Sequence, residues 1–127
     1  MQLVTVLCIL VVAGLASAGE DTYTDRFDNV DVHEILNNKR LLITYLTCIL
    51  EEKAKCTTEG RELKSNIKEA LETYCKKCTK VQFNWTRLVI AHLINHEPAY
   101  WDKLVAKYDP DHKYTQKYEN ELREIKG

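Results

Sequence analysis

Residues 48–78 read CILEEKAKCTTEGRELKSNIKEALETYCKKC. Between the second and third of the four cysteines in this stretch, apolar side chains recur every three or four residues, which is the spacing of one face of an α-helix. We therefore predict a helix from about Thr58 to Tyr74 with two cysteines close together at each end. Cys48 and Cys56 precede this helix, and Cys75 and Cys78 follow it.

The length of the predicted helix limits how the four cysteines can pair. A helix of about 17 residues is about 25 Å long, whereas a disulfide joins α-carbons about 4.4–6.8 Å apart. If the helix is continuous, only the local pairs Cys48–Cys56 and Cys75–Cys78 remain. A zinc site is less favoured because the first two cysteines are too far apart for a zinc knuckle. A thioredoxin-like redox role is less favoured because no strand precedes Cys75.

The rest of the chain is predicted to be helical as well. Between residues 20 and 126 the only glycine and prolines are Gly60, Pro98 and Pro110, which is fewer turn residues than strands and hairpins need. Asp31 as a cap, with Glu34 three residues on, predicts a helix at about residues 32–36. Apolar periodicity predicts further helices at about residues 39–52, 77–95 and 98–108, and from about residue 113. The stripe predicted for the helix at residues 77–95 consists of Val81, Trp85, Leu88, Val89, His92 and Leu93. The expected fold is all-α, a compact bundle of five to six helices with two local disulfides.

The first 18 residues have the composition of a secretory signal peptide. They contain no charge and end in Ala16-Ser17-Ala18, a pattern typical of a cleavage site; a buried N-terminal helix is the less favoured alternative. Removing residues 1–18 also removes Cys8 and leaves four cysteines, an even number suited to an oxidising compartment. We expect a secreted, extracellular protein with a flexible arm at residues 19–29, one domain at residues 30–127 and no membrane insertion.

Composition and motifs exclude several classes of function. The chain has 18 Lys+Arg against 19 Asp+Glu, so no basic surplus indicates a nucleic acid partner. Neither a phosphate-binding loop nor a nucleophile motif is present, so we expect no enzyme and no cofactor. His92 and His96 are four residues apart but lack a third ligand, so we expect no metal site. Lys76, Lys77 and Lys80 form a small cationic patch, either a solvated surface or a site for a ligand carboxylate.

Several segments resemble the insect chemosensory proteins, the OS-D-like or ejaculatory bulb-specific protein family. Besides the spacing Cys48-x7-Cys56-x18-Cys75-x2-Cys78, the similar segments are YTDRFDNVDVHEIL (residues 23–36), NKRLL (38–42), CTTEGRELK (56–64), CKKC (75–78) and AKYDPDHKYTQKYE (106–119). The resemblance implies a soluble six-helix carrier. Its apolar internal channel would hold fatty-acid-like, odorant or pheromone-like molecules, and some members of the family act outside olfaction.

Two features depart from the family pattern. Seven residues separate Cys48 from Cys56, where the family usually has six, so we expect the disulfide to persist with a changed corner. Phe83-Asn84-Trp85-Thr86 stands where the family tends to carry polar or small residues, and it creates a glycosylation sequon at Asn84. A glycan at Asn84 and an unused sequon are both open.

The resemblance also implies where a ligand would bind. Tyr45 and Trp101 correspond by position to aromatic residues near the family's channel. Eight more candidates rest on apolar stripe position alone, which does not separate cavity lining from packed core: Leu42, Leu46, Ile49, Ile67, Leu71, Val89, Leu93 and Val105. The expected partner is one small apolar ligand bound to a monomer. The alternative is a secreted interaction or developmental protein with a packed core and a protein partner.

Overall fold

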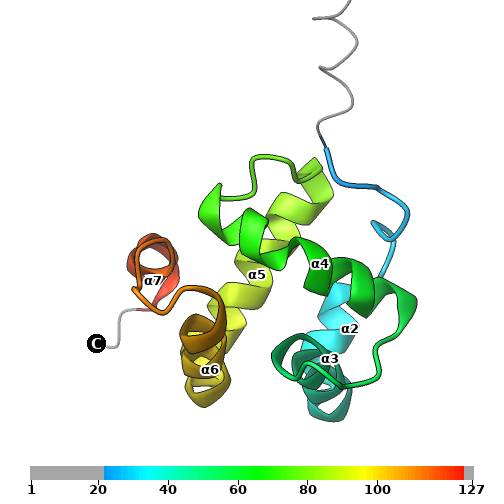
Figure 1. The fold of residues 1–127 in the computed structure, drawn as a ribbon, viewed down its shortest axis with the longest axis horizontal. Helices are drawn as coiled ribbons and strands as arrows, with labels where there is room; N and C mark the ends of the chain where they lie inside the picture. The colour runs from blue at the N-terminus through cyan, green and yellow to red at the C-terminus, as the bar shows by residue number, and fades with distance from the viewer. Residues whose placement is uncertain (1–21, 125–127) are drawn as a thin grey trace, which may run out of the picture.

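The computed structural model describes residues 22–124, and within that range it contains helices and no strand. In chain order the helices are α2 (Val32–Asn37), α3 (Lys39–Leu50), α4 (Thr58–Glu72), α5 (Lys80–His96), α6 (Pro98–Tyr108) and α7 (Thr115–Leu122). Figure 1 shows α5 in the middle of the molecule, with α2 and α3 to one side and α6 and α7 to the other. α4 packs against α3. The prediction of an all-α fold is confirmed.

Side-chain caps fix where four of the helices begin. The side-chain oxygens of Asp31, Asn38, Thr57 and Thr79 each accept a hydrogen bond from the backbone N–H three residues further on, which satisfies a donor that the first helical turn leaves unpaired. Asn38 therefore ends α2 and begins α3 in one step. The predicted start of the fourth helix at residue 77 is early, because the cap at Thr79 begins α5 at Lys80.

Both disulfides are local, as predicted. Cys48 is bonded to Cys56 and Cys75 to Cys78, with Cα–Cα distances of 5.2 and 5.0 Å. The first ring closes the corner between α3 and α4, and the second closes the turn between α4 and α5.

The third predicted helix extends two residues too far. α4 ends at Glu72, and Tyr74 and Cys75 adopt left-handed backbone conformations with φ of 55° and 66°. Such conformations are unfavourable for residues other than glycine, so tertiary contacts must hold them. Cys75 is tied to Cys78, and the Tyr74 ring lies 5.8 Å from the ring of Tyr118 on α7.

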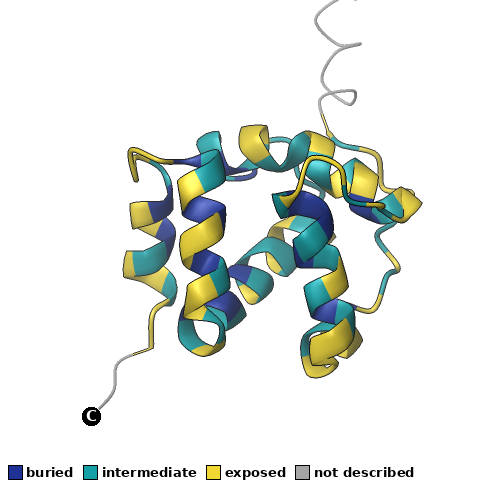
Figure 2. Cartoon of the chain, turned by 60° about the horizontal axis from the view of Figure 1, so that its bottom comes forward, coloured by how far each residue is buried: buried dark blue, intermediate teal, exposed yellow. Residues whose placement is uncertain are grey.

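The buried residues lie mainly where the helices face one another, and the exposed residues lie mainly on the outer sides of the helices (Figure 2). The core contains Leu42, Leu46, Cys48, Ile49, Leu71, Ile90, Leu93, Ile94, Trp101, Leu104, Val105 and Tyr118. On α5 the predicted apolar stripe was partly wrong, because Val81 and Leu88 are exposed. Apolar residues surround α5 on several sides, so their periodicity does not select the buried face.

Residues 22–29 lie against the turn between α4 and α5. The backbone N–H of Tyr23 donates to the carbonyl of Lys77 at 2.8 Å, and the Thr79 hydroxyl donates to Asp28 at 2.7 Å. Gln82 also donates to the Thr24 carbonyl and to Asp28. The sequence predicts a flexible arm here; its residues 23–28 are held by hydrogen bonds, and residues 19–21 lie outside the described range. The predicted signal peptide, residues 1–18, also lies outside it and stays a prediction.

Candidate ligand-binding cavity

A cavity of about 270 Å³ lies between the helices and is partly open to the surface, and its walls come from all six described helices and from residues 23–30. Pockets for small molecules typically measure about 300–1,000 Å³. The cavity is therefore close to the lower end of that range, with room for one small molecule.

α3 contributes an apolar wall. Leu42, Tyr45, Leu46 and Ile49 line the cavity and recur at intervals of three and four residues, so they share one helix face. Tyr45 is the polar member of this wall. Burial raises the pKa of its phenol, the charge of Glu59 raises it further, and a hydrogen bond with Thr57 acts in the opposite direction. At neutral pH the hydroxyl is protonated and can donate a hydrogen bond.

The wall formed by α4 changes along the helix from acidic to apolar. Its lining residues follow one helix face: Glu59, Glu62, Leu63, Asn66, Ile67, Ala70 and Leu71. The two glutamates belong to the first two turns, and the alanine and Leu71 belong to the last turn. Because a helix rises about 1.5 Å per residue, about 14 Å separates Glu62 from Leu71 along the axis. One wall thus offers a polar end and an apolar end.

α5 contributes another part of the lining with residues that share one helix face: Gln82, Trp85, Thr86, Val89, Ile90 and Leu93. The Thr86 hydroxyl donates to the Gln82 carbonyl at 2.8 Å, which is the hydrogen bond that a threonine often makes within its own helix. This leaves mainly aromatic and aliphatic surface toward the cavity.

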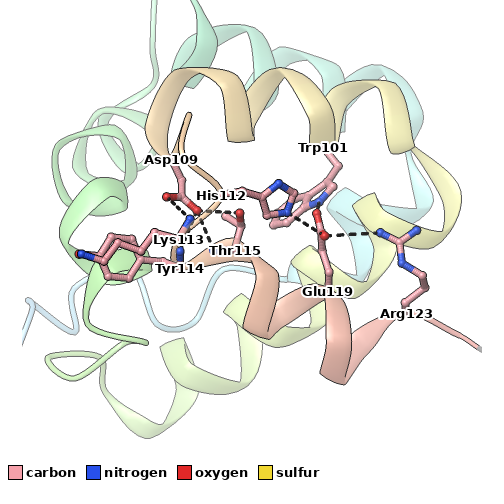
Figure 3. Close-up of polar contacts among 8 residues, drawn as sticks. All are labelled: Trp101, Asp109, His112, Lys113, Tyr114, Thr115, Glu119 and Arg123. Atoms are coloured by element: carbon pink, nitrogen blue, oxygen red, sulfur yellow. Dashed lines mark hydrogen bonds and ion pairs between the residues drawn. The ribbon is translucent and has the colours of Figure 1, made fainter.

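Trp101 on α6 lines the cavity and is held from behind by α7. It is only 3% exposed, and its indole Nε1–H donates to Glu119 Oε2 at 2.6 Å. The other carboxylate oxygen of Glu119 lies 2.8 Å from His112 Nε2 and 3.9 Å from Arg123 (Figure 3). A buried indole N–H needs a partner, and Glu119 supplies it while fixing the plane of the ring.

A buried carboxylate joins α6 to α7. Asp109 Oδ2 accepts the backbone N–H groups of Tyr114 and Thr115 and the Thr115 hydroxyl, and Oδ1 accepts the N–H of Lys113 (Figure 3). Burial alone would raise the pKa of Asp109, but these hydrogen bonds stabilise the ionised form and hold its pKa below the usual value. The corner is thereby fixed by one charged side chain.

All ten residues predicted to bind a ligand line this cavity: Leu42, Tyr45, Leu46, Ile49, Ile67, Leu71, Val89, Leu93, Trp101 and Val105. They come from α3, α4, α5 and α6, and the fold brings them around one space. Their role in binding a ligand stays a prediction.

Sequence reasoning missed other lining residues: Tyr23, Phe27, Ile35, Leu36, Trp85, Ile90 and Leu104. Tyr23 and Phe27 belong to a segment without periodicity, although two aromatic residues in a polar arm are themselves a signal of burial. Trp85 lies on the stripe predicted for α5 but was not singled out.

The remaining candidates lie elsewhere. Lys76, Lys77 and Lys80 are outside the cavity lining, and Lys77 is 3.3 Å from Glu69. The His92 and His96 rings are 5.1 Å apart, and burial, followed by the charge of His96, lowers the pKa of His92. Residues 22–124 contain no group of three or more His, Cys, Asp or Glu side chains that could hold a metal ion.

Asn84 of the predicted sequon is exposed on α5, and glycosylation there stays a prediction. In the described part of the chain, no helix is both long enough and apolar enough to cross a membrane.

Comparisons with known proteins agree with this architecture. The chain is 40% identical over 121 residues to "Allergen Tha p 1" of Thaumetopoea pityocampa, covering 95% of each chain. It is 43% identical over 113 residues to ejaculatory bulb-specific protein 3 of Drosophila melanogaster, covering 89% of each.

Solved structures are similar as well. A chemosensory protein in complex with bromo-dodecanol is 47% identical, with a TM-score of 0.74 over 79% of this chain and 99% of that one. Antennal chemosensory protein A6 of the moth Mamestra brassicae is 45% identical, with a TM-score of 0.66 over 73% and 90% of the two chains. The model of the insect pheromone-binding family, A10/OS-D, matches residues 23–116. The predicted resemblance is therefore confirmed, and the chain belongs to the insect pheromone-binding family A10/OS-D.

Proposed function

We propose that this protein is a secreted carrier that reversibly binds one small apolar molecule in the cavity between its helices. The observation that carries the proposal is the cavity itself, which is lined mainly by aliphatic and aromatic side chains. Burying apolar surface is favourable without any covalent chemistry, at about 25 cal/mol per Å². Carriage therefore needs only shape, apolar walls and a few polar anchors.

The relatives support the same role. A chemosensory protein of similar fold has been solved with bromo-dodecanol, a long-chain alcohol, and another relative is named a putative odorant-binding protein of Drosophila melanogaster. This family consists of carriers rather than enzymes. For the present chain we propose long-chain, odorant-like or pheromone-like molecules as the ligand class, and release into the extracellular space after removal of residues 1–18.

A cavity-filling substitution tests the proposal. Ala70 lines the cavity on α4, so Ala70→Leu should place three extra carbon atoms in the space that a ligand needs. We expect at least about tenfold weaker binding of an apolar fluorophore, with an unfolding free energy unchanged or raised by up to about 1 kcal/mol. The measurements are a fluorescence titration of oxidised residues 19–127 and a denaturant titration of the same samples.

Ala106→Leu is the matched control, since Ala106 is exposed on α6 and outside the cavity. It should leave fluorophore binding unchanged. If Ala70→Leu and the parent protein bind the fluorophore equally well, the cavity is not the binding site. A flat titration of the parent protein, with helical circular dichroism and no free thiols, would instead favour the interaction protein with a protein partner.

A further inference from the structure

We infer that the cavity discriminates against carboxylate headgroups and accepts chains that end in a hydrogen-bond donor, an alcohol or a protonated amine. This inference rests on the proposed carrier function and narrows its ligand class. It depends on which charged and polar groups face the cavity and on how their hydrogen-bonding capacity is already used.

The charges that line the cavity have one sign. Glu59 and Glu62 are both half-buried at the acidic end of the α4 wall, and no Lys, Arg or His of the described residues lines the cavity. A carboxylate that enters would meet two like charges and no cation. Burying an ion without a partner is costly, and a like-charged neighbour adds to that cost.

The cations nearest in sequence to this end of α4 contact other groups. Arg61 donates to the Cys56 carbonyl, and Lys64 donates to the Glu51 carbonyl at 2.7 Å. Both side chains line a separate groove at the corner between α3 and α4. At the arm, Lys77 lies 3.3 Å from Glu69. None of the three is placed to compensate a carboxylate in the cavity.

Most hydrogen-bond donors that line the cavity already donate within the protein. The donors with internal partners are Tyr23, Asn66, Gln82, Thr86, Trp101 and Thr115. Thr24, Tyr45 and Trp85 supply neutral donors, and the phenol of Tyr45 lies within the field of Glu59. A carboxylate is an acceptor only, so in this lining it would find three neutral donors and, among the described residues, no cation.

Acceptors are more plentiful at the same end of the wall. The Asn66 amide nitrogen donates to the Glu62 carboxylate at 2.9 Å and to the Glu62 carbonyl at 3.1 Å. Among the described residues, no hydrogen bond uses the amide oxygen of Asn66 or the carboxylate of Glu59 as its acceptor, and both residues line the cavity. A hydroxyl both donates and accepts, and an ammonium group only donates, so both match this end of the wall while an alkyl chain lies along its apolar end.

The test compares three ligands with the same twelve-carbon chain. Dodecanol, dodecylamine and dodecanoate each displace an apolar fluorophore from oxidised residues 19–127 at neutral pH, so that only the headgroup differs. We expect dodecanoate to bind at least about tenfold more weakly than dodecanol, and dodecylamine to bind at least as tightly as dodecanol.

Glu59→Gln/Glu62→Gln tests whether the two glutamates cause the discrimination. This variant should bind dodecanoate at least about threefold more tightly and dodecylamine more weakly, with little change for dodecanol. Glu72→Gln/Glu124→Gln is the matched control, because it removes the same charge from residues outside the cavity lining. It should bind all three ligands as the parent protein does.

The outcomes separate this inference from the carrier function. Dodecanoate binding as tightly as dodecanol overturns the inference and leaves the carrier function standing. A headgroup preference that survives Glu59→Gln/Glu62→Gln overturns the role of the two glutamates. A folded protein that binds neither the fluorophore nor any of the three ligands overturns the carrier function and the inference together.

Discussion

Carboxylates at the corner between α6 and α7 are used differently from those on the cavity wall of α4. At the corner, buried Asp109 accepts four hydrogen bonds, and Glu119 accepts the indole N–H of Trp101. On α4, Glu59 and Glu62 line an open space, and only Asn66 donates to the Glu62 carboxylate. A carboxylate with its acceptor sites filled fixes the backbone around it, whereas one with free lone pairs remains available to a ligand.

The difference separates stability from binding within one small domain. Substitutions at the corner should mainly change the free energy of unfolding, because they leave buried donors without partners. Substitutions on the α4 wall should mainly change ligand affinity, because their side chains border free volume rather than packed neighbours.

The largest expected effect is that of Asp109→Ala. It leaves the Thr115 hydroxyl and three backbone N–H groups without their acceptor, and we expect a loss of about 3 kcal/mol of unfolding free energy, measured by denaturant titration. Asp111→Ala is the control, since Asp111 is exposed at the same corner, and it should change stability by no more than about 0.5 kcal/mol.

The pH dependence of stability tests whether the charge of Asp109 contributes to the stability of the corner. The folded-state pKa of Asp109 is below its usual value, so its contribution is complete above the unfolded pKa, about 3.9, and is lost as pH falls through the lower folded pKa. The parent protein should therefore lose more stability than Asp109→Asn does below about pH 4. Parallel profiles of unfolding free energy against pH for the two proteins would show that the charge of Asp109 does not contribute to stability.

The two disulfides should also differ in how far they affect stability and ligand affinity. By the chain-entropy model, Cys48→Ala/Cys56→Ala opens the larger ring and should cost about 2.6 kcal/mol, and Cys75→Ala/Cys78→Ala should cost about 1.9 kcal/mol. Cys78 lines the cavity, whereas Cys48 and Cys56 do not. We expect the order to reverse for fluorophore affinity, with the second variant binding more weakly than the first. Loss of stability and of affinity in the same order would contradict this separation.

Local signals in the sequence were enough to predict most of the fold. The cap at Asp31, the helical spacing of apolar residues and the two pairs of cysteines act over a few residues, and each is confirmed in the structure. The apolar stripes on α3 and α4 also select cavity-lining residues correctly, because each of these helices has one clearly apolar face. On α5 the same method failed in part, since apolar residues surround that helix.

Contacts between distant residues could not be predicted in this way. Tyr23 donates to Glu69, which is 46 residues away, and Trp101 donates to Glu119, which is 18 residues away. No periodicity connects such pairs, because the fold decides which polar groups meet. The free volume of the cavity could not be predicted in this way either, because it depends on how far apart the helices pack rather than on the composition of any one helix.

The smallest expected effect concerns the contact between the two regions, where Glu119 at the corner holds Trp101 in the cavity wall. If Glu119 acts on binding through the indole N–H, Glu119→Ala should weaken fluorophore binding about threefold, because the freed ring no longer keeps one orientation. Trp101→Phe keeps an aromatic ring and removes the N–H, so Glu119→Ala should have no further effect on affinity in that background. The measurement is a double-mutant cycle of fluorophore affinity. An equal loss in both backgrounds would show that Glu119 affects binding by a route other than the indole N–H, such as its contacts with His112 or Arg123.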